Sequence, residues 1–163
     1  MNATTELLHN NESYAASFEH GELEAAPMRK VAVLTCMDAR IDPARLLGLE
    51  PGDAHVIRNA GGVVTDDALR SLAVSQHHLG TEEILVIQHT RCGMMTFTDD
   101  QFAEQLEQST GSRPSWRSHT FTDLEESVRE GVGRIRSVPF VPRKEHVRGF
   151  VYEVESGRLR EVE

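Results

Sequence analysis

Two cysteines and one histidine have the residue types and positions expected of a metal site. Cys36 directly follows the segment VAVLT at residues 31–35, His89 directly follows the segment ILVIQ at residues 84–88, and Cys92 lies three residues further on. Two thiolates and an imidazole form a donor set that suits zinc, and three protein ligands leave a fourth position for water or substrate. His-x-x-Cys alone is a weak motif, and either cysteine could instead be a buried structural thiol. The metal interpretation therefore depends on a fold that brings all three together.

Charged residues close to the first cysteine strengthen this interpretation. In Cys36-Met-Asp-Ala-Arg40 an acid and a base follow the cysteine at the second and fourth positions. A third segment, Arg58-Asn-Ala-Gly-Gly62, would bring backbone amides to the same region, although it could also be an ordinary glycine turn that ends a strand.

Four short segments are predicted as strands. Two of them are continuous aliphatic runs without alternation, which is typical of strands buried on both faces of a parallel sheet. The four segments are residues 31–35, 55–58, 84–88 and 150–154. Residues 65–79 separate the second and third strands and have helical apolar spacing, with Thr65 as N-cap and Gly80 as the stop. This segment is expected to be a crossover helix.

Two capping-box patterns, at Thr98 and Thr122, predict further helices, and the tail predicts a turn into a short last strand. The alternation of strands and helices predicts a single α/β domain with a central, mainly parallel sheet of order 2-1-3-4, flanked by helices. In that order the carboxyl ends of the first and third strands are adjacent at the switch point, where ligands collect. The predicted topology would therefore place Cys36 beside His89 and Cys92.

With these motifs the sequence resembles the β-class carbonic anhydrases, in particular their compact, short-chain bacterial and archaeal-type subgroup. The likeness covers roughly residues 28–155 and is carried by Cys36-Met-Asp-Ala-Arg40, Arg58-Asn-Ala-Gly-Gly62 and His89-Thr-Arg-Cys-Gly93. Ala39 stands where the family usually has a serine. The resemblance implies one Zn²⁺ per chain, held by Cys36, His89 and Cys92, and a lyase that interconverts carbon dioxide plus water with bicarbonate plus a proton by zinc-hydroxide attack.

The resemblance also implies roles for the remaining motif residues. Asp38, paired with Arg40, would form a catalytic dyad that orients the hydroxide, whereas Asp38 bound to zinc as a fourth ligand would give a closed, inactive state. The expected substrate wall consists of Asn59, Ala60, Gly61 and Gly62. Two alternatives remain open: a carbonyl sulfide or carbon disulfide hydrolase on the same scaffold, and a non-catalytic module with a structural zinc. No other histidine, His119 included, has a partner pattern that assigns it a role.

Composition limits the partners. The chain has 163 residues, enough for one domain, and its net charge of −9 argues against a nucleic-acid partner or an anionic membrane surface. The longest apolar runs have four residues, far fewer than the roughly 20 of a membrane helix. No secretory signal is recognised at the N-terminus, so a cytoplasmic location is expected.

The N-terminal segment is expected to form an arm. Residues 1–25 are polar apart from a few apolar side chains, so they predict either a loose arm or a helix that needs another surface; these side chains are Leu7, Leu8, Tyr14 and Phe18. Residues 26–163 would form the zinc-binding domain. The resemblance implies a homodimer or a higher even oligomer in which this arm packs on the partner.

Overall fold

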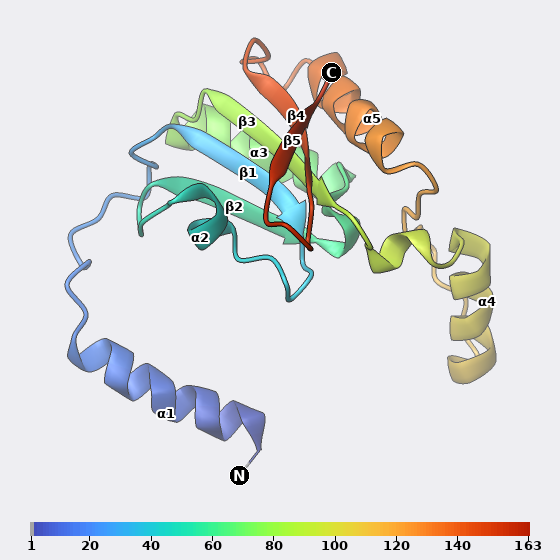
Figure 1. Ribbon diagram of the computed structural model, residues 1–163, viewed down its shortest axis with the longest axis horizontal. Coiled ribbons are helices and arrows are strands. Elements are labelled where there is room, and N and C mark those ends of the chain that lie inside the picture. Colours follow the sequence, from blue (N-terminus) through green and yellow to red (C-terminus); the bar gives the residue numbers. More distant parts are fainter. Residues whose placement is uncertain (1) are drawn as a thin grey trace.

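A computed structural model describes residues 2–163, which fold around one five-stranded sheet (Figure 1). The strands are β1 Val31–Cys36, β2 Ala54–Asn59, β3 Glu83–His89, β4 Val147–Tyr152 and β5 Leu159–Val162, in the order β2-β1-β3-β4-β5. The first four are parallel, and β5 runs antiparallel to β4. The predicted α/β class, the order 2-1-3-4 and the short last strand are confirmed.

The register of the sheet decides which residues meet at its carboxyl edge. Thr35 on β1 is aligned with Arg58 on β2 and with Ile87 on β3. The pairing of β1 with β3 ends there, while β3 continues to His89 beside β4. Cys36 and His89 therefore leave the sheet at the same edge, between the two strands where the chain order reverses.

The described chain has five α-helices: α1 Ala3–Ala16, α2 Pro43–Leu47, α3 Asp66–Leu79, α4 Asp99–Thr110 and α5 Leu124–Ser137. The caps predicted for α3 and α4 are present, with Thr65 and Thr98 accepting backbone hydrogen bonds at the N-termini. The capping box predicted at Thr122 is wrong by one residue. Asp123 is the N-cap of α5, and its carboxylate accepts a hydrogen bond from the amide of Glu126. Glu126 is the third residue of the helix, and its amide has no partner within the helix, so a side chain at the N-cap position satisfies it.

One face of the sheet is covered by α3 and α5, which pack their apolar residues against β1, β3 and β4. The shared core consists of Ala32, Leu34, Val64, Ala68, Leu69, Leu72, Ile84, Val86, Val132, Ile135, Val141 and Val147. Gly149 on β4 admits the close approach of α5, since a Cβ there would lie 2.4 Å from a methyl group of Val128. This packing fixes the strands whose ends carry the functional side chains.

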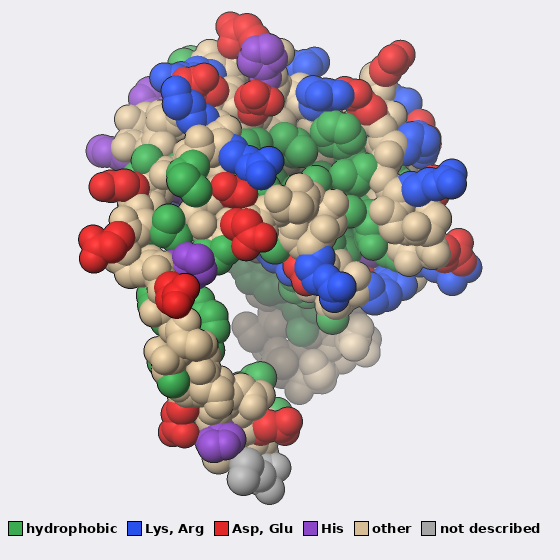
Figure 2. All heavy atoms as spheres, turned by 60° about the vertical axis from the view of Figure 1, so that its left-hand side comes forward, with side chains coloured by type: hydrophobic (Ala, Val, Ile, Leu, Met, Phe, Trp, Pro, Cys, Tyr) green, Lys and Arg blue, Asp and Glu red, His purple; other side chains and the backbone are tan. Residues whose placement is uncertain are grey.

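Two helices extend from this body, α1 at the N-terminus and α4 on the opposite side (Figure 1). Neither contains a buried residue in the described chain. Figure 2 shows the N-terminal arm descending from the body with hydrophobic side chains exposed along it. Among the described residues every helix is too short or too polar to cross a bilayer.

Candidate metal centre

The fold brings Cys36, His89 and Cys92 together. One ligand atom from each residue lies within 4.8 Å of the others, and all three side chains are buried. Both cysteines are free thiols. Strand β1 supplies Cys36, β3 supplies His89, and Cys92 precedes the short 3₁₀ turn η2 Gly93–Met95. Of the residues that the structure describes, these are the only His, Cys, Asp and Glu side chains clustered in this way.

The histidine ring is oriented as a metal ligand would be. His89 Nδ1 lies 2.8 Å from the carbonyl oxygen of Thr90, and because a carbonyl only accepts, Nδ1 carries the proton. The lone pair is then on Nε2, which is fully buried and has no hydrogen-bond partner in the described chain. An unpartnered buried nitrogen is costly unless a ligand satisfies it. The residues present therefore fit a zinc ion.

Electrostatics at the cluster favour a thiolate. The hydrogen bond from the Cys92 thiol lowers the pKa of Cys36, against the opposing effect of burial, and raises the pKa of Cys92. Burial alone would lower the pKa of His89, but the charge of the neighbouring Cys36 thiolate and the carbonyl of Thr90 outweigh burial and raise it. One negative charge is thus stabilised on sulfur by the protein itself, and a bound dication would stabilise the second.

A backbone amide supports this thiolate. The amide of Gly61, in the 3₁₀ turn η1 Ala60–Gly62, donates to Cys36 Sγ over 3.3 Å. The carbonyl of the same glycine accepts a 2.9 Å hydrogen bond from Gln88 Nε2, a side chain that is 1% exposed. Sequence reasoning missed Gln88. Its position directly before His89 on a buried strand is the signal that could have singled it out, because a polar side chain buried in a sheet needs a partner.

The second glycine of the turn is required by its backbone contacts. Gly62 has φ +62°, and a Cβ there would lie 2.8 Å from the amide nitrogen of Cys36 and 2.9 Å from the carbonyl oxygen of Ile87. The turn therefore sits tightly at the switch point between β1 and β3. The wall residues predicted from sequence divide accordingly: Asn59, Ala60 and Gly61 line the pocket described below, whereas Gly62 is packed against the backbone.

Gly62→Ala is expected to destabilise the fold by roughly 2–5 kcal/mol, because left-handed strain and overpacking add at this position. Gly80→Ala is the matched control, since Gly80 has φ +73° with nothing within 4 Å of its Cβ position. Gly80→Ala should lower the free energy of unfolding by only about 1–2 kcal/mol, because left-handed backbone strain is then the sole contribution. Urea unfolding of the two variants measures the difference, and equal losses would contradict the close-packing argument.

Asp38 and Arg40 form a bidentate ion pair beside the cluster. Arg40 Nε donates to Asp38 Oδ1 over 2.9 Å, and Nη2 donates to Oδ2 over 2.8 Å. Arg40 Nη2 also donates to the carbonyl of Arg91. The guanidinium holds the pKa of Asp38 well below its usual range, so the carboxylate stays ionised. Asp38 Oδ2 lies 3.6 Å from His89 Nε2, which places the paired carboxylate at the edge of the metal cluster.

Arg58 fixes the backbone of the loop that carries this ion pair. Its Nε donates to the carbonyl of Cys36, and its Nη2 donates to the carbonyls of Asp38 and Ile41 over 2.8 and 3.1 Å. Three carbonyls on one guanidinium hold the loop in a single conformation. The sequence singled out the segment that begins at Arg58 as a substrate wall but gave no indication of this positioning contact.

A cavity of about 680 Å³, called here the metal pocket, opens beside Cys36, Asp38 and Cys92. Its walls are largely apolar and include aromatic side chains from α4 and the flanking loops. The lining residues beyond the turn 59–61 include Met94, Phe97, Phe102, Trp116, Arg117, Ser118 and His119. Sequence reasoning missed this aromatic wall, since its residues are up to 80 positions from Cys36 and share no motif with it.

Comparisons with known proteins agree on one family. A family model described as carbonic anhydrase matches residues 31–120. The chain is 49% identical to beta-carbonic anhydrase 1 of Mycobacterium tuberculosis over 162 residues, covering 99% of each protein. It is 38% identical to a carbon disulfide hydrolase of an Acidianus species, covering 81% of this chain and 76% of that protein. The crystal structure of a carbonic anhydrase from Streptococcus mutans superposes with a TM-score of 0.94 at 42% identity, covering 100% of this chain and 99% of that one.

Proposed function

The chain belongs to the β-class carbonic anhydrases, zinc lyases that interconvert carbon dioxide and bicarbonate, and we propose that it catalyses this reaction with Cys36, His89 and Cys92 as metal ligands. The observation that carries the residue assignment is the unpartnered, fully buried Nε2 of His89 facing two thiols. When bound, zinc supplies the Lewis acidity that lowers the pKa of a water molecule and makes a nucleophile available near neutral pH.

The protein's own residues then orient the reaction. Asp38, ionised and held by Arg40, accepts a hydrogen bond from the nucleophile and thereby directs its lone pair. Arg40 acts on the carboxylate and not on the substrate, so it is a positioning residue. The apolar wall of the metal pocket suits carbon dioxide, which carries no charge and makes weak hydrogen bonds. The residues Asn59, Ala60 and Gly61 would form the substrate side of that wall.

Stopped-flow measurement of carbon dioxide hydration, with zinc content determined on the same sample, tests this function. Hydration activity that scales with zinc at one ion per chain is expected. Protein that contains one zinc per chain but lacks hydratase activity at every pH would instead support a structural zinc closed by Asp38.

Carbon disulfide hydrolysis is the second candidate, since a relative 38% identical to this chain is named a carbon disulfide hydrolase. The same nucleophile could attack the carbon atom of carbon dioxide or that of carbon disulfide. The β-carbonic anhydrase of M. tuberculosis is more similar and matches over almost the whole chain, so carbon dioxide is favoured. Side-by-side assays with the two substrates on one preparation separate the candidates, and faster turnover of carbon disulfide would reverse the preference.

We further propose that residues 1–25 are an arm that packs on a second copy of the chain, giving a homodimer or a higher even oligomer, with residues 26–163 as the zinc-binding domain. The support is the exposure of apolar side chains along α1 and the segment after it: Leu7, Leu8, Tyr14 and Phe18 are each 47–66% exposed. Large apolar side chains grouped on an otherwise polar helix are typical of a covered surface.

Deleting residues 1–25 should weaken the dimer and lower activity, because the apolar side chains of the arm would no longer be buried between subunits. Sedimentation velocity over a range of concentrations measures the first effect, and hydration assays at the same concentrations measure the second. A matched variant, Leu7→Ser with Leu8→Ser, keeps the full length and should have the same direction of effect. A truncated protein that stays dimeric and fully active would contradict the proposal.

We propose a cytoplasmic location because both cysteines are free thiols. Cys36 and Cys92 are buried together as free thiols, and a reducing compartment keeps such a pair available for zinc.

A further inference from the structure

Hydration of carbon dioxide releases a proton, which must travel from the buried cluster to solvent in every turnover. Few side chains on the wall of the metal pocket can carry it. Asp38 is held as a carboxylate by Arg40, and guanidinium groups keep their proton at physiological pH. An imidazole exchanges protons between about pH 5 and 8. Among the described residues that line the pocket, His119 is the only histidine.

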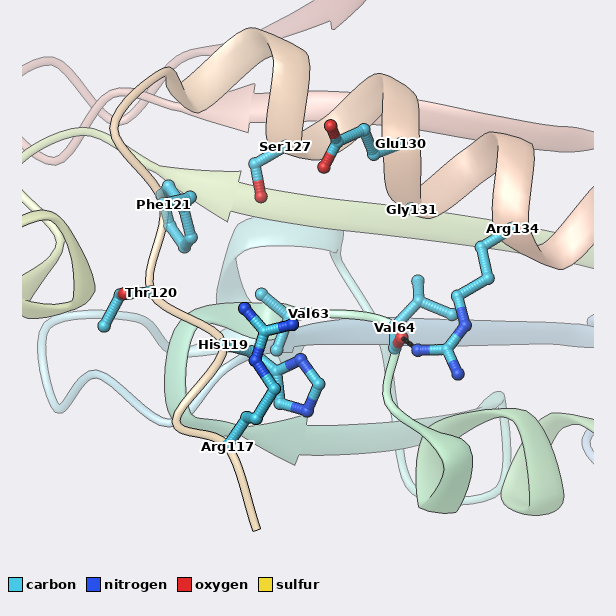
Figure 3. A pocket seen from close by; sticks show the side chains of 10 residues that line it. All are labelled: Val63, Val64, Arg117, His119, Thr120, Phe121, Ser127, Glu130, Gly131 and Arg134. Carbon is cyan, nitrogen blue, oxygen red and sulfur yellow. Dashed lines mark hydrogen bonds between the residues drawn. The ribbon is translucent and has the colours of Figure 1, made fainter. Parts of the chain in front are cut away.

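His119 borders the metal pocket and two further hollows of the surface. It also lines a hollow of about 250 Å³ between its own loop and α5, and a third hollow of about 490 Å³ toward the start of α3. Figure 3 shows the imidazole of His119 beside Val63 and below the guanidinium of Arg117. Because the side chain is exposed, the ring can reach both the pocket and bulk water.

The loop holds His119 in an unusual backbone conformation. Its φ is +60°, in the left-handed region that costs most residues about 1–2 kcal/mol. Asp99, at the start of α4, anchors the loop before and after His119: it accepts from Arg117 Nε over 3.0 Å and from the amide and hydroxyl of Thr120, each over 2.9 Å. The position of residue 119 is thus fixed from both sides, while within residues 2–163 no protein group hydrogen-bonds to its ring.

The guanidinium groups around His119 are already paired with carboxylates. Arg117 on its own loop is paired with Asp99, and Arg134 on α5 is paired with Asp66 on α3. Two further carboxylates, Glu130 on α5 and Asp67 on α3, line the same hollows. With each guanidinium already neutralised, these hollows are poor sites for an anion, and His119 takes part in no ion pair within the described chain.

We propose that His119 is the proton-relay residue of this enzyme, an inference that rests on the proposed carbon dioxide hydration. Neutral imidazole takes up the released proton at one ring nitrogen through water in the metal pocket. The protonated ring then gives a proton to a buffer base on the solvent side, and the neutral ring is restored. Only N–H bonds form and break, so the step needs no further reactant besides the buffer.

The test uses His119→Asn, because asparagine tolerates the left-handed backbone but does not titrate. Stopped-flow hydration in dilute buffer should give a kcat at least about 100-fold below that of the wild type, the smallest effect typical of losing a positioned acid–base group, with zinc content unchanged. The ratio kcat/KM should be retained, because it reports steps before proton release. Added imidazole should restore kcat. His78→Asn, which removes an exposed histidine on α3 that borders none of these hollows, is the control and should keep wild-type kcat.

Three outcomes would overturn the relay. The first is a His119→Asn variant with the kcat of the wild type in dilute buffer. The second is a parallel loss of kcat and kcat/KM, and the third is a loss of kcat that imidazole does not restore. Either of the last two would indicate a structural role for His119. In all three the wild-type enzyme hydrates carbon dioxide normally, so the proposed function stands. A zinc-loaded wild-type protein without hydratase activity would instead overturn the proposed function, and the relay with it.

Discussion

Cys36→Ser and Cys92→Ser are each expected to lose zinc and hydratase activity together. Each change replaces a soft thiolate by a hydroxyl that stays protonated, so one of three protein ligands disappears. Removing an outer-shell partner of a metal ligand commonly costs about 10–100-fold, and removing a ligand itself should exceed that range. Zinc measured by atomic absorption after gel filtration, and hydration rates on the same fractions, check the prediction.

His78→Ala provides the control for these serine variants, because it removes a surface histidine of α3 and should leave one zinc per chain. The stability of the variants is informative as well. Without zinc the buried Nε2 of His89 has no partner in the described chain, so each serine variant should unfold at a lower temperature than the zinc-loaded enzyme. Full zinc and full activity in either variant would show that the ligand assignment is wrong.

The sequence predicts the framework of this site well because the framework depends on local patterns. The run of aliphatic residues at 84–87 is long enough and free enough of alternation to indicate a buried parallel strand. Cys36 and His89 are each separated by one residue from the end of such a run, so the order of the strands is enough to bring them together. The caps of α3 and α4 are also local signals, with Thr65 and Thr98 followed by acidic residues in the first turn.

The features that sequence reasoning missed depend on partners distant in the chain. Gly62 is required because backbone from two strands lies within 2.9 Å of its Cβ position, a contact that exists only once β1 and β3 are neighbours. Asp99 fixes Thr120 across 21 residues, and no local pattern indicates this contact. The left-handed backbone of His119 has no sequence signal of its own. Helix α2 was missed because five residues are too few to show periodicity.

Arg40→Ala and Asp38→Ala should both lose most of the activity, but the groups bound to the metal should differ between the two variants. In the structure the carboxylate is held by two hydrogen bonds from Arg40, yet its Oδ2 lies only 3.6 Å from His89 Nε2. Arg40→Ala removes the partner on one side. Because the carboxylate of Asp38 is ionised through the neutral range, it should then bind the metal as a fourth protein ligand, which is the closed state.

Arg40→Ala is therefore expected to retain zinc and to lose about 10–100-fold in activity at neutral pH, the range typical of second-shell changes. Asp38→Ala should also retain zinc and be slow, for a different reason: the metal stays open, but no group directs the nucleophile. X-ray absorption separates the two variants by the neighbours of zinc, with two sulfurs, one nitrogen and a carboxylate oxygen for Arg40→Ala, and a water oxygen in place of the carboxylate for Asp38→Ala. Arg40→Lys is the matched control, because the ammonium keeps the positive charge but cannot form the bidentate pair with Asp38. The activity of this variant should fall between those of the wild type and Arg40→Ala. Near-normal activity of Arg40→Ala with a water on zinc would show that Asp38 needs no partner to keep the site open, while the assignment of Cys36, His89 and Cys92 would stand.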